Sequence, residues 1–295
     1  MRKQFKDTIM DLSADDDSIV LVFGDVSVYL FDEFKRKYPD RFYNMGICEN
    51  TLISVSGGLR SQGFTPFVHT ITPFLTERSL EQIKLDLCYN RFPANLVTCG
   101  ASFDYAWDGA THHSYTDLAN LRLLPEIEVL QPGSTKELDV LLRSQYNSDK
   151  TTYFRLSDHP HQIDVPVAFG KGVIIRDVGA DLTVMTAGPI LDNVLQAASD
   201  LDINLVYFHT IKPIDIALIE KFRQTRIVVI HDAHGLYEAI AEVPHLSLSY
   251  YGLGDHFCSW YGTVHDARHQ LGLDAGGIAS YLRSQIQKEG RLHVL

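Results

Sequence analysis

Short apolar runs rich in β-branched residues alternate with amphipathic segments through the first half of the chain. Residues 19–25 and 64–71 have the pattern of buried strands, whereas residues 49–63 and 79–90 have the periodicity of helices. Such alternation predicts a parallel sheet that is covered by helices on both faces. Further strands are expected at residues 94–100, 127–131 and 152–156, and further helices at residues 29–38, 116–124 and 135–146.

The alternation breaks at residues 157–172 and then starts again. This stretch, SDHPHQIDVPVAFGKG, contains two prolines and two glycines, a composition typical of a linker. The pattern predicts an α/β protein with two doubly wound domains, residues 1–160 and 173–295, joined by a linker over residues 161–172. In the second domain, strands are expected at residues 182–187, 205–209, 226–231 and 245–250, and helices at residues 190–201, 214–222, 236–242 and 276–289.

The composition narrows the class of protein. The 295 residues are 45% hydrophobic and 21% charged, and the formal net charge is −11. A charge of this sign argues against nucleic-acid binding, which needs a basic surface, and the apolar runs fall short of the ~18 residues that a membrane span requires. The four cysteines show no metal-ligand spacing. We therefore expect reduced structural thiols, no metal site and a cytoplasmic location.

Two segments carry more specific information than the alternation. The first is NMGICENTLISVSGGLRSQGFTPFVHTITPFLTERSLEQI at residues 44–83, and the second is DGATHHSYTDLANLRLLPEIEVLQPG at residues 108–133. Both segments, in this order, resemble the thiamine-diphosphate enzymes of the transketolase group. The resemblance covers nearly the whole chain and is closest to the C-terminal half of a transketolase whose gene is split in two. It implies a transketolase pyrimidine-binding domain followed by a transketolase C-terminal domain.

The resemblance also implies a cofactor and a partner. Enzymes of this group bind thiamine diphosphate and hold its diphosphate through Mg²⁺ and a GDG…N motif in a separate domain. This sequence lacks that motif, so the resemblance implies an N-terminal transketolase subunit that carries the diphosphate and the metal. A diphosphate without a cation or a helix N-terminus would bind poorly. The twofold symmetry of the group implies a homodimer of this chain within an α₂β₂ heterotetramer.

Glu49 is the first candidate for a catalytic and cofactor-binding residue. By position alone it is a carboxylate at the start of a predicted helix, where it would interact with the helix dipole. Within GICEN, however, it matches the glutamate that the family places at a ring nitrogen of the aminopyrimidine. A hydrogen bond there favours the imino tautomer, whose imine removes the proton from C2 of the thiazolium. Because the carboxyl must donate or share a proton, we expect it to be desolvated.

The same resemblance implies further site residues. Phe74 matches the aromatic residue that stacks on the aminopyrimidine, although most phenylalanines are core residues. His112 matches a catalytic histidine near the donor's carbonyl and hydroxyl oxygens, where it can donate a hydrogen bond or shuttle a proton. His113 and Asp108 are also expected to bind substrate, and Asp108 matches an aspartate that contacts a substrate hydroxyl in transketolases.

The chain departs from the family pattern where sugar phosphates bind. Sugar-phosphate transketolases carry a histidine near the position of Gly100 and an arginine near that of Asp158, and both help to bind the terminal phosphate. A carboxylate at this second position would repel a phosphate dianion. Arg155 lies close by in the sequence and is the candidate for a substitute cation that binds substrate. We therefore expect ordinary pentose phosphates to be poor donors.

The resulting hypothesis is one subunit of a thiamine-diphosphate-dependent transketolase, a transferase of carbohydrate metabolism. It would move a two-carbon ketol unit from a ketose to an aldehyde, with a small sugar or sugar phosphate as substrate. One alternative is a 2-oxoacid-decarboxylating component that resembles deoxyxylulose-phosphate synthase or a dehydrogenase β subunit, which the His-His pair favours. Another is a non-catalytic regulatory subunit, against which the joint presence of Glu49, Phe74 and His112 argues.

Overall fold

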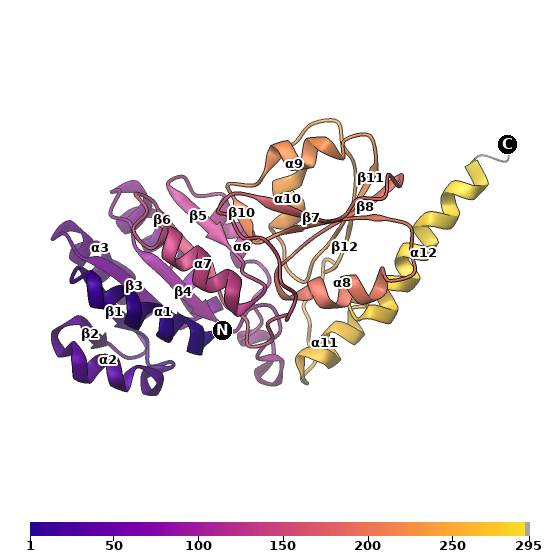
Figure 1. Ribbon diagram of the computed structural model, residues 1–295. Helices are drawn as coiled ribbons and strands as arrows, with labels where there is room; N and C mark the ends of the chain where they lie inside the picture. Colours follow the sequence, from indigo (N-terminus) through magenta and orange to yellow (C-terminus); the bar gives the residue numbers. More distant parts are fainter. Residues whose placement is uncertain (293–295) are drawn as a thin grey trace.

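The computed structural model describes residues 1–292, so residues 293–295 of the predicted second domain lie outside the described part. Within the described residues, two β-sheets lie side by side, each flanked by helices (Figure 1). The first half of the chain builds most of the larger sheet, and the second half builds the smaller one. The predicted α/β class with two wound sheets is therefore confirmed.

The larger sheet has the strand order β10-β5-β6-β4-β3-β1-β2. Its strands are parallel to their neighbours except for β10, which pairs antiparallel with β5 and sets Thr210 opposite Leu130. The strands are β1 (Ile19–Phe23), β2 (Phe42–Asn44), β3 (Thr65–Ile71), β4 (Asn95–Cys99), β5 (Ile127–Leu130), β6 (Thr151–Arg155) and β10 (Thr210–Lys212).

The smaller sheet has the strand order β12-β11-β8-β9-β7. It is parallel except at β7, which runs antiparallel to β9. The strands β8 and β9 are buried along their whole length, as expected for parallel strands that are covered on both faces. The strands are β7 (Gly172–Arg176), β8 (Leu182–Ala187), β9 (Asn204–Phe208), β11 (Arg226–Ile230) and β12 (Ser247–Tyr251).

Helices follow most of the parallel strands and cover both sheets (Figure 1). The segment predicted as one amphipathic helix at residues 79–90 is a short α-helix that continues as a π-helix, Ile83–Tyr89. The α-helices are α1 (Arg2–Asp15), α2 (Asp32–Lys37), α3 (Glu49–Ser61), α4 (Thr72–Thr76), α5 (Leu80–Gln82), α6 (Asp117–Arg122), α7 (Thr135–Gln145), α8 (Leu191–Ala197), α9 (Ile216–Lys221), α10 (Leu236–Ala241), α11 (Val264–Gln270) and α12 (Ala275–Leu292).

The hydrophobic core runs without interruption from one sheet to the other. One cluster of buried side chains contains Val129 and Tyr153 from the larger sheet together with Met185, Val206 and Phe208 from the smaller one. A second cluster lies under α1 and α7 on the opposite face of the larger sheet. Burial of these apolar side chains is the main term that stabilises both halves. The cluster shared by the two sheets fixes their relative position.

The pattern of hydrophobic positions missed α1, β2, α4, β7, β10 and α11. Of these, β10 matters most for the architecture, because it belongs to the second half of the chain but completes the edge of the larger sheet. A wholly parallel sheet was expected, so the antiparallel edge strands are a correction. Three-residue strands such as β2 and β10 are too short for a period-2 pattern to be recognised.

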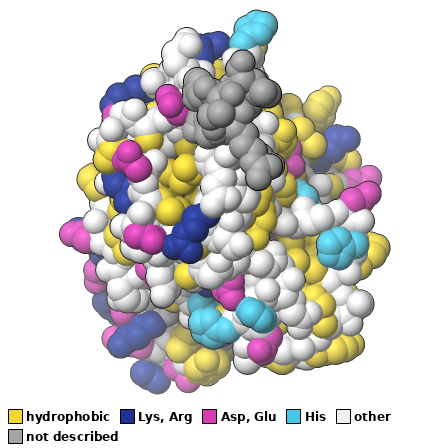
Figure 2. Space-filling model, turned by 90° about the vertical axis from the view of Figure 1, so that its right-hand side faces the viewer, with side chains coloured by type: hydrophobic (Ala, Val, Ile, Leu, Met, Phe, Trp, Pro, Cys, Tyr) yellow, Lys and Arg dark blue, Asp and Glu magenta, His cyan; other side chains and the backbone are white. Residues whose placement is uncertain are grey.

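Charges of both signs are mixed on the side of the molecule from which α12 projects. Basic and acidic side chains lie interspersed there, with several histidines among them (Figure 2). The net charge of −11 is therefore not gathered in one acidic patch on this face. None of the described helices is long and apolar enough to cross a membrane.

Candidate functional site

The predicted site residues lie at the carboxyl ends of parallel strands. Glu49 begins α3 shortly after β2, Phe74 lies in α4 directly after β3, and His112 lies in the long connection after β4. The carboxyl ends of parallel strands meet along one edge of a sheet, which is where open α/β sheets bind ligands. The topology thus brings together three segments that are far apart in the sequence.

Glu49 is buried and ion-paired. Its side chain is 2% exposed, and its Oε2 accepts a hydrogen bond from Nη1 of Arg78 at 2.7 Å. The side chain of Arg78 is 47% exposed, so water reaches the pair from the arginine side. The desolvation expected of Glu49 is present. Arg78 was not among the predicted site residues, because a sequence motif does not show which distant side chain an arginine will pair with.

Phe74 joins this ion pair to His112. The guanidinium carbon of Arg78 lies 4.6 Å from the centre of the Phe74 ring. The ring of His112 meets the same phenylalanine edge-on, with the centroids 5.0 Å apart and the planes at 71°. Phe74 is only partly buried. The structure therefore brings Glu49, Phe74 and His112 into one cluster around Arg78, in which Arg78 contacts Glu49 and Phe74, and Phe74 contacts His112.

The loop over residues 101–114 presents His112 and Asp108 near the protein surface. Asp108 is exposed and His112 is half-buried, with its Nδ1 2.9 Å from Oγ1 of Thr111. The loop turns at Gly109, where φ is +73°, a value that glycine adopts without strain. A Cβ at this glycine would lie 2.5 Å from the ring of Tyr261, so the close approach of that ring also requires glycine.

His113 has the surroundings of a core residue. It is 4% exposed, and its ring lies 5.1 Å from that of Phe103 and 5.6 Å from that of Trp260. Burial lowers the pKa of His113, because the charged imidazolium loses its hydration. The neighbouring histidines of the sequence motif are therefore separated by the fold, one toward Phe74 and one into the interior of the loop.

Arg155 was predicted to bind substrate, but the structure encloses it within the protein. Its guanidinium is fully buried, and Nε lies 2.7 Å from Oδ2 of Asp117. Its Nη2 donates to the carbonyl oxygen of Ser114 at 2.6 Å. Burial alone would lower the pKa of Arg155, but Asp117 outweighs it and the pKa lies above its ordinary value. A cation enclosed by protein in this way is a structural group and not a free phosphate ligand.

Asp158 and Gly100 also have neighbours that the sequence did not reveal. The two carboxylate oxygens of Asp158 accept hydrogen bonds from Nε and Nη2 of Arg2 at 3.1 and 3.0 Å. This pair compensates the negative charge that was expected to repel phosphate. At Gly100, φ is +82° and a Cβ would lie 2.5 Å from the ring of Tyr105, so that ring takes the space of a side chain at this position.

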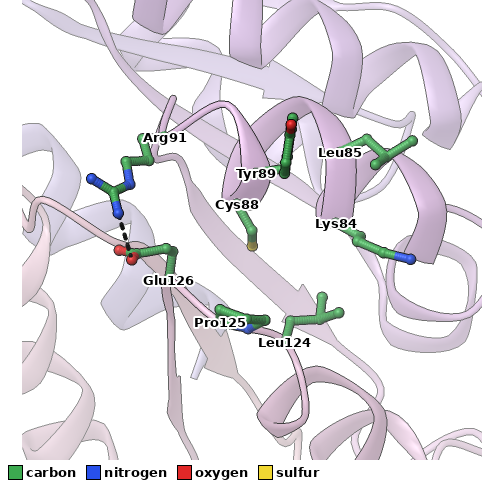
Figure 3. Close-up of a pocket in the computed structure, with 8 residues that line it drawn as sticks. All are labelled: Lys84, Leu85, Cys88, Tyr89, Arg91, Leu124, Pro125 and Glu126. Carbon is green, nitrogen blue, oxygen red and sulfur yellow. Dashed lines mark hydrogen bonds and ion pairs between the residues drawn. The ribbon is translucent and has the colours of Figure 1, made fainter.

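Two hollows on the surface lie outside the cluster around Arg78. One has a volume of about 400 Å³ and lies between the π-helix and the turn before β5 (Figure 3). Burial raises the pKa of its Cys88 to about 11, which keeps the thiol protonated and unreactive. This hollow is lined by Lys84, Leu85, Cys88, Tyr89, Arg91, Leu124, Pro125 and Glu126.

Another is a wider groove of about 680 Å³ between the two halves of the chain. Its wall includes Tyr115 and Thr116, which directly follow the loop, and Tyr250 from the smaller sheet. Thr116 Oγ1 donates to Oε1 of Glu77 at 2.8 Å, so the groove begins beside the segment that carries Arg78. Among the described residues, no group of three His, Cys, Asp or Glu side chains is arranged to hold a metal ion.

The fold is that of a transketolase-type chain. The family model for the transketolase pyrimidine-binding domain matches residues 1–159, and the chain belongs to this family. An apulose-4-phosphate transketolase subunit of Phocaeicola vulgatus is 29% identical over 97% of each chain. An uncharacterised 33.6 kDa protein of the fasciation locus of Rhodococcoides fascians is 32% identical over 91% of this chain and 89% of its own length.

Longer relatives match over part of their length. The 1-deoxy-D-xylulose-5-phosphate synthase of Cupriavidus taiwanensis is 31% identical over 86% of this chain, which spans 42% of that enzyme. A solved structure described as a split-gene transketolase in an inactive β₄ tetramer has a TM-score of 0.83 and 25% identity, with 96% of each chain covered. The chain is therefore a C-terminal subunit of a split transketolase-like enzyme, and its family implies thiamine diphosphate and a partner subunit.

Proposed function

We propose that this chain is the pyrimidine-binding subunit of a transketolase that transfers a two-carbon ketol unit from a ketose to an aldehyde. The observation that carries the proposal is the cluster of Glu49, Phe74 and His112, which separate strand ends bring together. Membership of the transketolase family supports it. A purely regulatory subunit would have no need to keep a buried carboxyl, a partly open aromatic ring and a histidine linked by successive contacts through Arg78.

The cluster has the chemistry that an aminopyrimidine requires. The partly open ring of Phe74 offers a face for stacking, and the buried carboxyl of Glu49 can share a proton with a ring nitrogen. Arg78 contacts both groups, so we expect it to move aside when the pyrimidine enters. When bound, thiamine diphosphate supplies the carbon nucleophile that attacks the donor carbonyl.

The residues of this chain then have separate tasks. Glu49 holds a proton at the pyrimidine nitrogen. His112, at the edge of Phe74, donates a hydrogen bond to an oxygen of the substrate and moves a proton there. Asp108, exposed on the same loop, accepts a hydrogen bond from a substrate hydroxyl. His113 and Arg155 are left out of this set, because both are buried among other protein groups.

The proposal requires a second chain. We propose an N-terminal transketolase subunit that holds the diphosphate and Mg²⁺, with two copies of each chain in a cytoplasmic α₂β₂ heterotetramer. The structural relative described as an inactive β₄ tetramer supports the view that a chain of this type needs its complement for activity. Calorimetry on the isolated chain should then show weak or no binding of thiamine diphosphate, with or without Mg²⁺.

The decisive experiment is reconstitution with the diphosphate-binding subunit. The complex should transfer a ketol unit from a ketose to an aldehyde, and complexes built with Glu49→Gln or His112→Ala should lose this activity. Ketol transfer at the wild-type rate by both variants would falsify the proposed site. Inactivity of the wild-type complex with every ketose tested would instead remove the proposed reaction.

Similarity to a 1-deoxy-D-xylulose-5-phosphate synthase supports a decarboxylating reaction as the second candidate. The 31% identity to a 1-deoxy-D-xylulose-5-phosphate synthase is as high as the identity to a transketolase subunit. A decarboxylating enzyme would release CO₂ from pyruvate in the presence of an aldehyde acceptor, whereas a transketolase would not. Measuring CO₂ release by the reconstituted complex separates the two reactions.

A further inference from the structure

The loop that carries His112 is closed at its base. The amide of Ser114 donates to the carbonyl oxygen of Ser102 at 2.8 Å, and the two residues form an antiparallel bridge. Ser102 has a φ of +51°, which is unfavourable for a residue with a side chain and must be held by its surroundings. The groups that hold Ser102 and Ser114 therefore set the position of the residues between them.

Arg155 holds both ends of this base. From the end of β6, its Nη1 donates to Oγ of Ser102 at 3.1 Å and its Nη2 donates to the carbonyl oxygen of Ser114 at 2.6 Å. Asp117 accepts from Nε and Nη2 of the same guanidinium at 2.7 and 3.1 Å. The planar guanidinium makes these bonds in a fixed geometry, and a buried charge must stay paired.

The second half of the chain completes this network. Ser102 Oγ donates to Oδ1 of Asp232 at 2.8 Å, and Nη2 of Arg268 lies 3.4 Å from Oδ2 of the same carboxylate. An arginine can only donate and an ionised carboxylate can only accept, so the serine hydroxyl joins Arg155 to Asp232 by doing both. Asp232 follows β11 and Arg268 lies in α11. Docking of the smaller sheet is thereby coupled to the loop.

We propose that Arg155, Ser102 and Asp232 are positioning residues that clamp the base of the loop and so fix His112 and Asp108 from behind. The effect on substrate rests on the proposed function, whereas the effect on the loop does not. The clamp gives Arg155 a task in the interior in place of the substrate contact expected from the sequence. Through Asp232, the second half of the chain also affects the position of the loop residues that face the substrate.

Ser102→Ala tests the clamp with the least disturbance, because Asp117 and Arg268 stay in place as partners of the buried charges. The matched control is Ser134→Ala, which also loses a buried hydroxyl that accepts a hydrogen bond, here from the amide of Glu137 at the start of α7. Hydrogen–deuterium exchange on the full chain reports the amides of residues 101–114.

We expect Ser102→Ala to speed exchange in this loop about five- to tenfold, because the two buried hydrogen bonds of its hydroxyl are lost. Ser134→Ala should leave exchange in the loop unchanged. A loop rate in Ser102→Ala equal to that of the wild type, or an equal rise in the control, overturns the clamp. Because this measurement uses the chain alone, it does not depend on the reaction or on the partner.

In the reconstituted complex, the same variant separates substrate positioning from cofactor activation. We expect the KM for the ketose donor to rise about five- to tenfold, while proton exchange at C2 of the bound cofactor, which depends on Glu49, keeps its wild-type rate. A loosened loop with an unchanged donor KM contradicts a positioning role. If Ser102→Ala loosens the loop but the wild-type complex shows no ketol transfer, the clamp is supported and the proposed function is wrong.

Discussion

Two of the arginine–carboxylate pairs in this molecule have the same N–O distance of 2.7 Å but opposite surroundings. In the cluster at the strand ends, Arg78 pairs with Glu49 and its side chain is 47% exposed. Behind the loop, Arg155 pairs with Asp117 and both side chains are 0% exposed. Water therefore reaches the first pair from one side, whereas protein encloses the second pair completely.

Burial, and not distance, sets what each pair can do. In the first pair water reaches Arg78 and screens its charge, so a ligand can displace this arginine at a lower cost than it could displace Arg155. In a fully buried pair, removal of one partner leaves the other charge without a partner and without water. Breaking such a pair therefore costs ~3–5 kcal/mol. Arg78 is accordingly suited to leave Glu49 when a cofactor arrives, and Arg155 is suited to stay.

The largest effect is expected at the acidic partner of the exchangeable pair. Glu49→Gln keeps the shape of the side chain but removes its acidic proton, so proton exchange at C2 of the cofactor in the complex should slow by about 10²–10⁴-fold. The melting temperature should change little, because the lost dipole term is only ~0.3–1 kcal/mol and the glutamine can still accept the hydrogen bond from Arg78. Both quantities are measured on one sample. Wild-type exchange with reduced stability would make Glu49 a helix-start residue only.

The sealed pair should dominate stability. Arg155→Met leaves Asp117 buried without its cation and should lower the free energy of unfolding by ~3–5 kcal/mol. Arg78→Met, its match in the open cluster, should lower it by clearly less, because water reaches this pair from the arginine side. Urea unfolding of the two variants side by side measures the difference. Equal losses of unfolding free energy in the two variants would mean that burial does not distinguish the two pairs.

The open pair should instead control cofactor affinity. Because Arg78 lies on Phe74 and bonds Glu49, the cofactor must displace it, and Arg78→Ala should lower the Kd of the complex for thiamine diphosphate about two- to fivefold. Arg60→Ala, at the far end of α3, is the control and should leave the Kd unchanged. A rise in Kd for Arg78→Ala would mean that this arginine holds the cofactor rather than covering its site.

A further effect of similar size concerns a third, partly exposed pair, Arg2 with Asp158. If the donor carries a phosphate, Arg2→Gln should raise its KM about two- to fivefold, and Asp158→Asn should lower it, because one change removes a cation and the other a carboxylate. Neither change should alter the KM of an unphosphorylated ketose. Steady-state kinetics with both donors tests this. Equal responses to both donors would place the phosphate away from Arg2.

The regular elements could be predicted because their signal is local. Glu49 and Phe74 were found through motifs in contiguous segments, and the fold then brought those segments to one sheet edge. The charged partners were not predictable in this way. Arg78 with Glu49, Arg2 with Asp158 and Asp232 with Ser102 are pairs that the sequence separates and that only the chain path joins. Arg155 was misassigned for the same reason, since nothing near it in the sequence shows that Asp117 buries it.

The helix α1 was missed although it carries a usable signal. Phe5 and Ile9 are both fully buried and lie four residues apart, the spacing of one helix face. Charged residues on either side masked this short apolar face. The consequence was more than a missing helix, because α1 is the element that brings Arg2 to Asp158.

The edge strand β10 has a consequence for how this protein is made. Strand β5 cannot complete its pairing until residues 210–212 have been synthesised, because those residues form its partner. Until then the larger sheet has an open edge of the kind that promotes pairing between chains. A nascent or truncated chain that ends in the linker would therefore be prone to aggregate, and the first half should fold productively only with the second half attached.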